Sequence, residues 1–127
     1  MKILIAVSDK KIRSDIKEIL RLNLKKGAGI QYIEAPDGKM ALAEIILIKP
    51  DIAILDIKLP FADAYKILST LKYLGKDELL AIPIIVISSH PDKTIFMKLL
   101  ELGAKDFLIK PIDIELLITK IEAHLKY

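Results

Sequence analysis

Four polar side chains stand at points where apolar, strand-length runs of the sequence end. Asp9, Asp56, Ser88 and Lys110 each follow such a run, at widely separated positions. Two carboxylates suit a hard divalent cation such as Mg²⁺, which favours one or two carboxylates together with water and phosphoryl oxygens. A lysine and a hydroxyl suit the remaining oxygens of a phosphoryl group. These residue types indicate metal-assisted phosphoryl chemistry if the fold brings them together.

Each of these residues also has a simpler interpretation. An aspartate such as Asp56 after an apolar run is commonly a loop residue or the cap of the following helix. Lys110 is equally consistent with a solvated lysine before a proline, and Ser88 with an ordinary hydroxyl at a strand end. The phosphoryl interpretation therefore depends on the elements that position the side chains.

The apolar pattern predicts alternating strands and helices. The run at 52–55 is apolar at every position, which is typical of a strand covered on both faces of a parallel sheet. Such alternation predicts an α/β fold, a doubly wound five-stranded parallel sheet with helices on both faces. The predicted strands lie at 2–7, 30–35, 52–55, 83–89 and 105–109, and the helices at 11–25, 39–48, 64–75, 92–102 and 113–126; the segment 76–82 has no firm assignment.

This topology decides where the polar residues go. In an open parallel sheet the carboxyl ends of the strands share one edge, and ligands bind there. Asp9, Asp56, Ser88 and Lys110 are therefore expected to meet at that edge, although they are far apart in the sequence.

Length and composition narrow the possibilities further. The chain has 127 residues, which suits one domain over 1–127, and 53% of them are hydrophobic, enough to form a core. It has no cysteine, no apolar stretch long enough to span a bilayer, and a first apolar run too short for a signal peptide. The net charge is +3, and the lysines are scattered beside acids without interleaved aromatics. We therefore expect a cytoplasmic domain with no membrane contact and no direct nucleic-acid binding.

Other chemistries fit the sequence poorly. No glycine-rich phosphate loop follows the first strand, which disfavours a nucleotide site of the flavodoxin-like kind. His90 lies close to Ser88, but the G-x-S-x-G turn of a serine hydrolase is absent. His124 is expected to be exposed on the last helix, and two distant histidines without cysteine make a zinc site improbable.

Several motifs occur in one order along the whole chain. They are Ala35-Pro36-Asp37-Gly38, Pro50-Asp51 through Leu55-Asp56 to Leu59-Pro60, Pro83 to Ser88, and Gly103-Ala104-Lys105-Asp106-Phe107-Leu108-Ile109-Lys110-Pro111. In this order and spacing the chain resembles the receiver domain of bacterial response regulators. The resemblance implies a flavodoxin-like (βα)5 fold with strand order 2-1-3-4-5.

The resemblance implies a role for each matching residue. Asp56 would be the phosphoacceptor, taking a phosphoryl group from a phosphohistidine of a histidine kinase or phosphotransfer protein. Asp9 would bind Mg²⁺ directly with Asp56, and Lys58 would contribute its backbone carbonyl. Ser88 would be the switch hydroxyl and Lys110 the lysine that pairs with the phosphoryl group. Such a domain is a phosphoacceptor that assists its own phosphorylation and dephosphorylation, and it is not an enzyme acting on a separate substrate.

The resemblance also implies an output. Phe107 matches the switch aromatic, whose rotamer follows the hydroxyl, although an aromatic in a short strand also packs as ordinary core. The Lys110–Pro111 bond is expected to be cis, as in the family. Phosphorylation would change the surface of the helix at 92–102, the strand at 105–109 and the helix at 113–126. That surface would act on a downstream protein target or on an effector domain outside this chain.

The chain departs from the family at several positions. The family usually carries two acids after the first strand, and Ser8 stands at the first of them. We expect weaker Mg²⁺ binding, since the missing acid ordinarily holds the metal through water. Ala64 replaces the family's glycine, which a helix start tolerates. Lys58 and His90 occupy the two variable positions beside the site, where they would tune the lifetime of the acyl phosphate or simply point to solvent.

A second class of function remains open. Because Ser8 removes one acid, the same fold would also suit a pseudo-receiver, a phosphorylation-independent protein-binding module. The joint presence of Asp9, Asp56, Ser88 and Lys110 favours a phosphorylated receiver, since a degenerate site has no physical need for all four.

Overall fold

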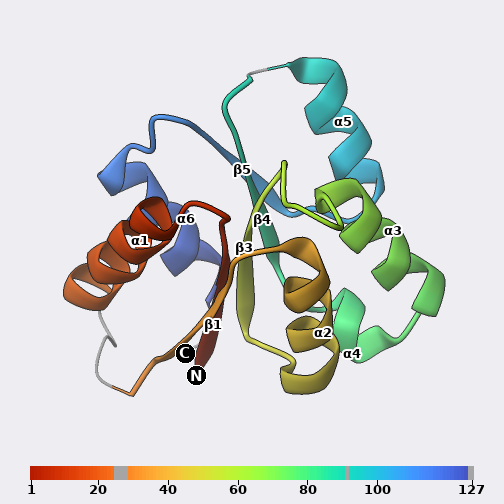
Figure 1. Ribbon diagram of the computed structural model, residues 1–127, viewed down its shortest axis with the longest axis horizontal. Coiled ribbons are helices and arrows are strands. Elements are labelled where there is room, and N and C mark those ends of the chain that lie inside the picture. Colours follow the sequence, from red (N-terminus) through yellow and green to blue (C-terminus); the bar gives the residue numbers. More distant parts are fainter. Residues whose placement is uncertain (25–28, 91, 126–127) are drawn as a thin grey trace.

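A five-stranded parallel sheet forms the centre of the protein in a computed structural model that describes residues 1–24, 29–90 and 92–125. The strand order β2-β1-β3-β4-β5 confirms the predicted doubly wound topology (Figure 1). Within the described residues the strands are β1 (Lys2–Ala6), β2 (Gln31–Ala35), β3 (Ile52–Asp56), β4 (Ile84–Ser88) and β5 (Asp106–Ile109), and the helices are α1 (Lys10–Asn23), α2 (Gly38–Ile48), α3 (Ala64–Leu74), α4 (Asp77–Leu80), α5 (Lys93–Glu101) and α6 (Ile114–His124).

Strand β3 lies in the middle of the sheet and is buried along its whole length. Its Ile54 pairs with Ile5 of β1 on one side and with Ile85 of β4 on the other. All three isoleucines are fully buried. Because neither face of β3 meets water, its side chains need not alternate between apolar and polar, which accounts for the unbroken apolar run at 52–55.

Helices cover both faces of the sheet. Figure 1 shows α1 and α6 on one side and α2, α3 and α5 on the other. The first layer packs on a core that includes Ile16 and Leu117, and the second on a core that includes Ile67 and Leu99. Successive strand residues point to opposite faces, so each strand contributes to both cores. The sheet is thereby held rigidly, with its carboxyl edge left open.

Five helices begin on that edge with an aspartate cap. In each case the aspartate carboxylate accepts a hydrogen bond from a backbone N–H in the first turn, which satisfies a donor that the helix itself leaves unpaired. These caps are Asp9 (α1), Asp37 (α2), Asp63 (α3), Asp92 (α5) and Asp113 (α6). Ala64 is the first residue of α3, as predicted, so the helix tolerates alanine at the position of the family's glycine.

The segment left unassigned in the sequence contains the short helix α4. The predicted ends of the first and last helices, at residues 25 and 126, lie outside the described residues. None of the helices in the described ranges combines the length and the apolarity needed to cross a membrane.

Candidate functional site

Asp56 and Lys110 meet at the carboxyl edge of the sheet. Asp56 is the last residue of β3, and only 6% of its surface is exposed. Its Oδ2 lies 2.6 Å from the Lys110 Nζ, and its Oδ1 accepts a hydrogen bond from the Lys58 backbone N–H at 3.3 Å. Burying a charged group is costly unless it is paired and hydrogen-bonded, and the Asp56 carboxylate has both kinds of partner. The predicted proximity of the two residues is confirmed.

The end of β5 sets the position of Lys110. Its backbone N–H donates to the Ser88 carbonyl oxygen at 2.8 Å, which continues the β4–β5 pairing by one residue. The Lys110–Pro111 bond is cis, as predicted. The Lys110 side chain therefore extends from the end of β5 past β4, and its ammonium contacts the Asp56 carboxylate at the end of β3.

Ser88 ends β4 and is almost completely buried, with 1% of its surface exposed. Its Oγ accepts a hydrogen bond from the His90 backbone N–H at 3.1 Å and donates to the His90 carbonyl oxygen at 3.2 Å. The hydroxyl is therefore engaged by the loop between β4 and α5, next to the strand that carries Asp56.

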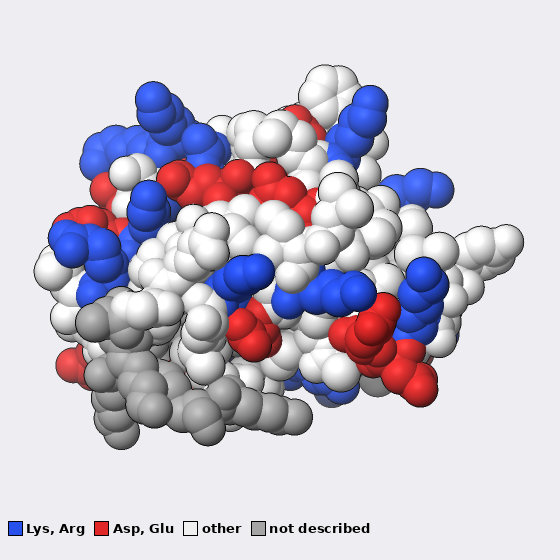
Figure 2. Space-filling model, turned by 90° about the horizontal axis from the view of Figure 1, so that it is seen from below, with Lys and Arg blue, Asp and Glu red and all other residues white. Residues whose placement is uncertain are grey.

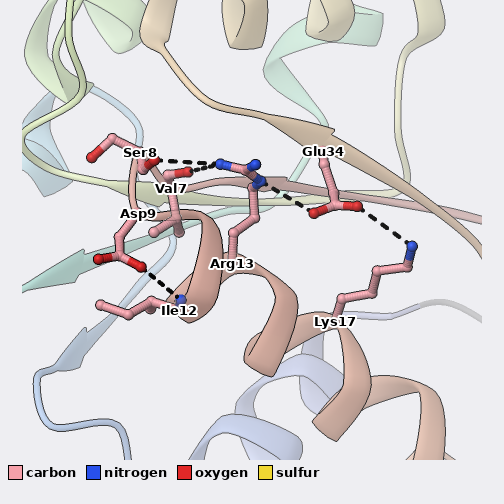
Figure 3. Close-up of polar contacts among 7 residues, drawn as sticks. All are labelled: Val7, Ser8, Asp9, Ile12, Arg13, Lys17 and Glu34. Carbon is pink, nitrogen blue, oxygen red and sulfur yellow. Dashed lines mark hydrogen bonds and ion pairs between the residues drawn. The ribbon is translucent and has the colours of Figure 1, made fainter.

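Asp9 lies at the start of α1, beyond the end of β1. Its Oδ1 accepts from the Ile12 backbone N–H at 3.0 Å and caps the helix (Figure 3). Ser8 and Asp9 are both exposed, so their side chains are open to solvent and to ligands. The cap uses one carboxylate oxygen, and a carboxylate has several lone pairs to offer.

Hard oxygen atoms, the ligands that Mg²⁺ prefers, stand at the ends of two neighbouring strands. They are the carboxylates of Asp9, after β1, and Asp56, at the end of β3, together with the backbone carbonyl of Lys58. The described residues contain no group of three or more acidic, histidine or cysteine side chains that would hold a metal by itself. A two-carboxylate set suits Mg²⁺, since that ion keeps several of its waters.

Phe107 lies in β5, opposite Val86 of β4, and is half-buried. Its ring stacks on Phe96 of α5, with centroids 4.7 Å apart and an interplanar angle of 25°. The stack joins β5 to α5, so a change in the rotamer of Phe107 has to alter the contact with that helix. The stack is consistent with both roles considered for Phe107, the switch aromatic and an ordinary core residue.

Comparison with known proteins identifies the family. The family model described as "Response regulator receiver domain" matches residues 3–122. The chain is a response regulator receiver domain. Of the solved structures, the receiver domain of the Francisella response regulator 1452 is 30% identical, with a TM-score of 0.84 over 97% of this chain and 94% of that one. The receiver domain of a signal transduction histidine kinase from Syntrophus aciditrophicus is 29% identical, with a TM-score of 0.81 over 98% and 89% of the two chains.

The curated relatives of the receiver are longer proteins. The response regulator MprA of Mycolicibacterium vanbaalenii is 29% identical over 99% of this chain and 51% of its own length. The transcriptional regulatory protein PrrA of Mycobacterium tuberculosis is 27% identical over 98% of this chain and 50% of its own. The chain thus spans about half the length of the curated relatives it matches.

A cleft of about 670 Å³ opens beside Ser88 and the residues that follow Asp56. Lys58 and His90, expected at the two variable positions beside the site, both line this cleft, one following β3 and the other following β4. His90 Nδ1 also lies 3.1 Å from the Ser89 Oγ. The cleft is lined by Ile57, Lys58, Leu59, Pro60, Asp63, Tyr65, Ser88, His90 and Ile95.

Sequence reasoning missed Arg13, which supports the loop that carries Asp9. Only 11% of the Arg13 side chain is exposed. Its Nη1 donates to the Val7 carbonyl oxygen at 2.7 Å, and its Nε to Glu34 Oε1 at 3.1 Å (Figure 3). Lys17 approaches the other Glu34 oxygen at 3.4 Å. The guanidinium thus ties α1 to the ends of β1 and β2, just before Ser8 and Asp9.

The prediction that His124 is an exposed residue of the last helix is wrong. It is half-buried, and its Nε2 lies 3.2 Å from Asp106 Oδ2, while Lys120 Nζ lies 2.5 Å from Asp106 Oδ1. Burial alone would raise the pKa of Asp106, but hydrogen bonds from Lys120, the Phe107 N–H and His124 together lower it below its usual value. The cluster fixes the start of β5 to α6, one residue from Phe107.

Proposed function

We propose that this receiver takes a phosphoryl group from the phosphohistidine of a histidine kinase or phosphotransfer protein onto Asp56. A carboxylate oxygen of Asp56 attacks phosphorus, the new oxygen–phosphorus bond forms, and the phosphorus–nitrogen bond of the donor breaks. The imidazole leaves and takes up a proton. The observation that carries this proposal is the buried ion pair between Asp56 and Lys110, 2.6 Å apart at the ligand-binding edge of the sheet.

Asp9, Asp56 and the Lys58 carbonyl would hold Mg²⁺ at this edge. The ion supplies charge that screens the repulsion between the carboxylate and the incoming phosphoryl group. Once Asp56 is phosphorylated, the Lys110 ammonium would pair with the phosphoryl oxygens instead of with the Asp56 carboxylate. Its side chain is 28% exposed, which leaves it room to move. Ser8 removes one acid from this set, so the affinity for the ion is expected to be lower than with two.

The output surface is formed by α5, β5 and α6. Ser88 would release the His90 backbone and turn toward the phosphoryl group, and Phe107 would follow it, as a shift between two pre-existing states. Large apolar side chains are exposed on all three elements: Met97 and Leu100 on α5, Ile109 on β5, and Ile114 and Leu116 on α6.

The partner on that surface is a downstream protein or an effector domain. The relatives named transcriptional regulators are about twice as long as this chain, which supports an effector domain in the whole protein. We place the receiver in the cytoplasm, and we assign it no direct contact with nucleic acid. Figure 2 shows basic and acidic side chains intermixed on the face of the molecule opposite the carboxyl edge of the sheet.

Phosphorylation is tested by the mass of the intact protein after incubation with Mg²⁺ and acetyl phosphate. The proposal predicts a gain of one phosphoryl group that chelation of Mg²⁺ abolishes and that Asp56→Asn lacks. If no mass is gained and beryllofluoride leaves the amide spectrum unchanged, the protein is a pseudo-receiver. That alternative is favoured by one observation, the serine at position 8 in place of an acid.

A further inference from the structure

The loop between β3 and α3 contains a strained turn. The Ala62 N–H donates to the Pro60 carbonyl oxygen at 2.8 Å, and Phe61 between them has a φ of 69°. A three-residue turn closed by such an i→i+2 hydrogen bond, with a positive central φ, is rare and strained for a residue with a side chain. Phe61 is 86% exposed, so burial of its side chain does not offset this strain. Such a conformation persists only where contacts around it impose it.

Gly38 at the start of α2 provides that contact. Its N–H donates to the same Pro60 carbonyl oxygen at 2.9 Å. A Cβ on residue 38 would lie 1.5 Å from the Ala62 carbonyl oxygen and 2.5 Å from its carbon. No side chain fits in that space, since the Cβ atoms of real residues essentially never come within 3.0 Å of a heavy atom to which they are not bonded. Glycine is therefore required here by the close approach of two backbones.

This contact lies in the loop that begins at the phosphoacceptor. The Ile57 N–H donates to the Ile87 carbonyl oxygen at 2.9 Å, and the Ala64 N–H donates to the Ile57 carbonyl oxygen at 3.2 Å, which fixes the two ends. Between them the Lys58 N–H reaches Asp56 Oδ1. The contact with Gly38 is the third fixed point, in the middle of the loop.

We propose that Gly38 is a positioning residue for the phosphoacceptor site. By admitting the Ala62 carbonyl where a side chain would stand, it holds the strained turn at Phe61 and so fixes the Lys58 backbone beside Asp56. The inference rests on the proposed function. It assigns a role at the site to a residue of α2, an element that includes none of Asp9, Asp56, Ser88 and Lys110.

Gly38→Ala tests this role against Gly75→Ala. Gly75 caps the far end of α3, where φ is 64° and a Cβ would meet no atom closer than 3.8 Å. Since α3 has 11 residues, this control lies roughly 16 Å along the helix from the loop. Both variants strain the backbone and lower the melting temperature. The readouts are the Kd for Mg²⁺ by calorimetry, the rate of phosphorylation by acetyl phosphate, and the amide NMR spectrum of the metal-free protein.

In Gly38→Ala we expect the metal-free amide resonances of residues 57–62 to shift, the Kd for Mg²⁺ to rise at least about fivefold, and phosphorylation to slow at least about tenfold. Gly75→Ala should stay within about twofold of the wild type in Kd and rate. A folded Gly38→Ala variant with wild-type Kd, rate and loop resonances would overturn the proposal. If the wild type itself is not phosphorylated, the proposed function fails instead, whereas the metal-free spectrum still tests the role of Gly38.

A double variant, Gly38→Ala with Phe61→Gly, keeps the test decidable if Gly38→Ala alone does not fold. Glycine at position 61 accepts a positive φ and lets the loop move away from the new methyl group. Folding should then recover while the Kd for Mg²⁺ stays raised, because the Lys58 backbone is no longer fixed. Phe61→Gly alone, with Gly38 in place, should bind Mg²⁺ as the wild type does. If the double variant recovers both folding and the wild-type Kd, Gly38 is needed only for stability and the proposal is overturned.

Discussion

The Lys110 ammonium lies 2.6 Å from the Asp56 carboxylate, across 54 positions of sequence and two strand ends. The carboxylate side chain is 9% exposed, and the lysine side chain 28%. The lysine is therefore the more exposed partner of the pair. If Asp56 takes up the proposed phosphoryl group, the same cation would be placed to pair with the phosphoryl oxygens.

Removal of Lys110 should destabilise the fold, because the buried carboxylate of Asp56 then loses its charged partner. Lys110→Met is expected to lower the free energy of unfolding at pH 7 by about 1–3 kcal/mol, measured by urea denaturation. Asp56→Asn in the same background should recover part of that loss, so the two substitutions are coupled. Strictly additive effects in the double-mutant cycle would contradict an ion pair that matters to the folded state.

Ser8→Asp should tighten Mg²⁺ binding. A second carboxylate beside the proposed metal position adds attraction on the order of 1 kcal/mol at an exposed site, or roughly a fivefold lower Kd. Calorimetric titration measures it, and Ser14→Asp, which adds the same charge at an exposed position within α1, is the matched control. Equal effects of the two substitutions would mean that only the overall charge of the protein matters.

The walls of the cleft should set the lifetime of the acyl phosphate. Lys58 and His90 both line the 670 Å³ cleft next to Ser88. Side chains there would limit the access of water to a phosphoryl group on Asp56. The double variant Lys58→Ala, His90→Ala is expected to lose its phosphoryl group several-fold faster after removal of the donor. The time course of intact mass follows this loss. An unchanged rate would show that both side chains point away into solvent.

Asp106 should make the stability of the domain depend on pH in the acid range. Its carboxyl group has a pKa below the usual value, so it binds fewer protons in the folded state than in the unfolded one. The stabilisation is therefore complete above the ordinary carboxyl pKa of about 3.9 and is lost as the pH falls through the lowered folded-state value. Asp106→Asn should cost about 1 kcal/mol at pH 7 and less at about pH 3, by urea denaturation. A cost that does not shrink on acidification would exclude the carboxylate as its source.

The sheet and its open edge were predictable because they depend on local patterns. An unbroken apolar run ending in Asp56 indicated both a buried central strand and a carboxylate at its end, and β3 spans Ile52–Asp56. The same logic brought Lys110 and Ser88 to one edge. The strand order brings residues that are far apart in the sequence to the same edge of the sheet. Their proximity could therefore be predicted without knowledge of side-chain contacts.

The contacts that hold the site together were not predictable in the same way. Arg13 pairs with Glu34 across 21 positions, and nothing in the sequence of α1 marks one cation as buried among many exposed ones. The exposure expected for His124 was wrong because its partner, Asp106, comes from another element. The clearance at Gly38 depends on where the Ala62 carbonyl lies. Each of these features depends on three-dimensional packing rather than on a periodic pattern.

The most direct test of the central claim is chemical trapping of the phosphorylated residue. Sodium borohydride reduces an aspartyl phosphate to the alcohol, which converts the modified aspartate into homoserine. After incubation with Mg²⁺ and acetyl phosphate, reduction and proteolysis, tandem mass spectrometry should find homoserine at position 56, and only when both the donor and Mg²⁺ are present. Homoserine at another acid such as Asp9, or phosphorylated protein with an unmodified Asp56, would contradict the account.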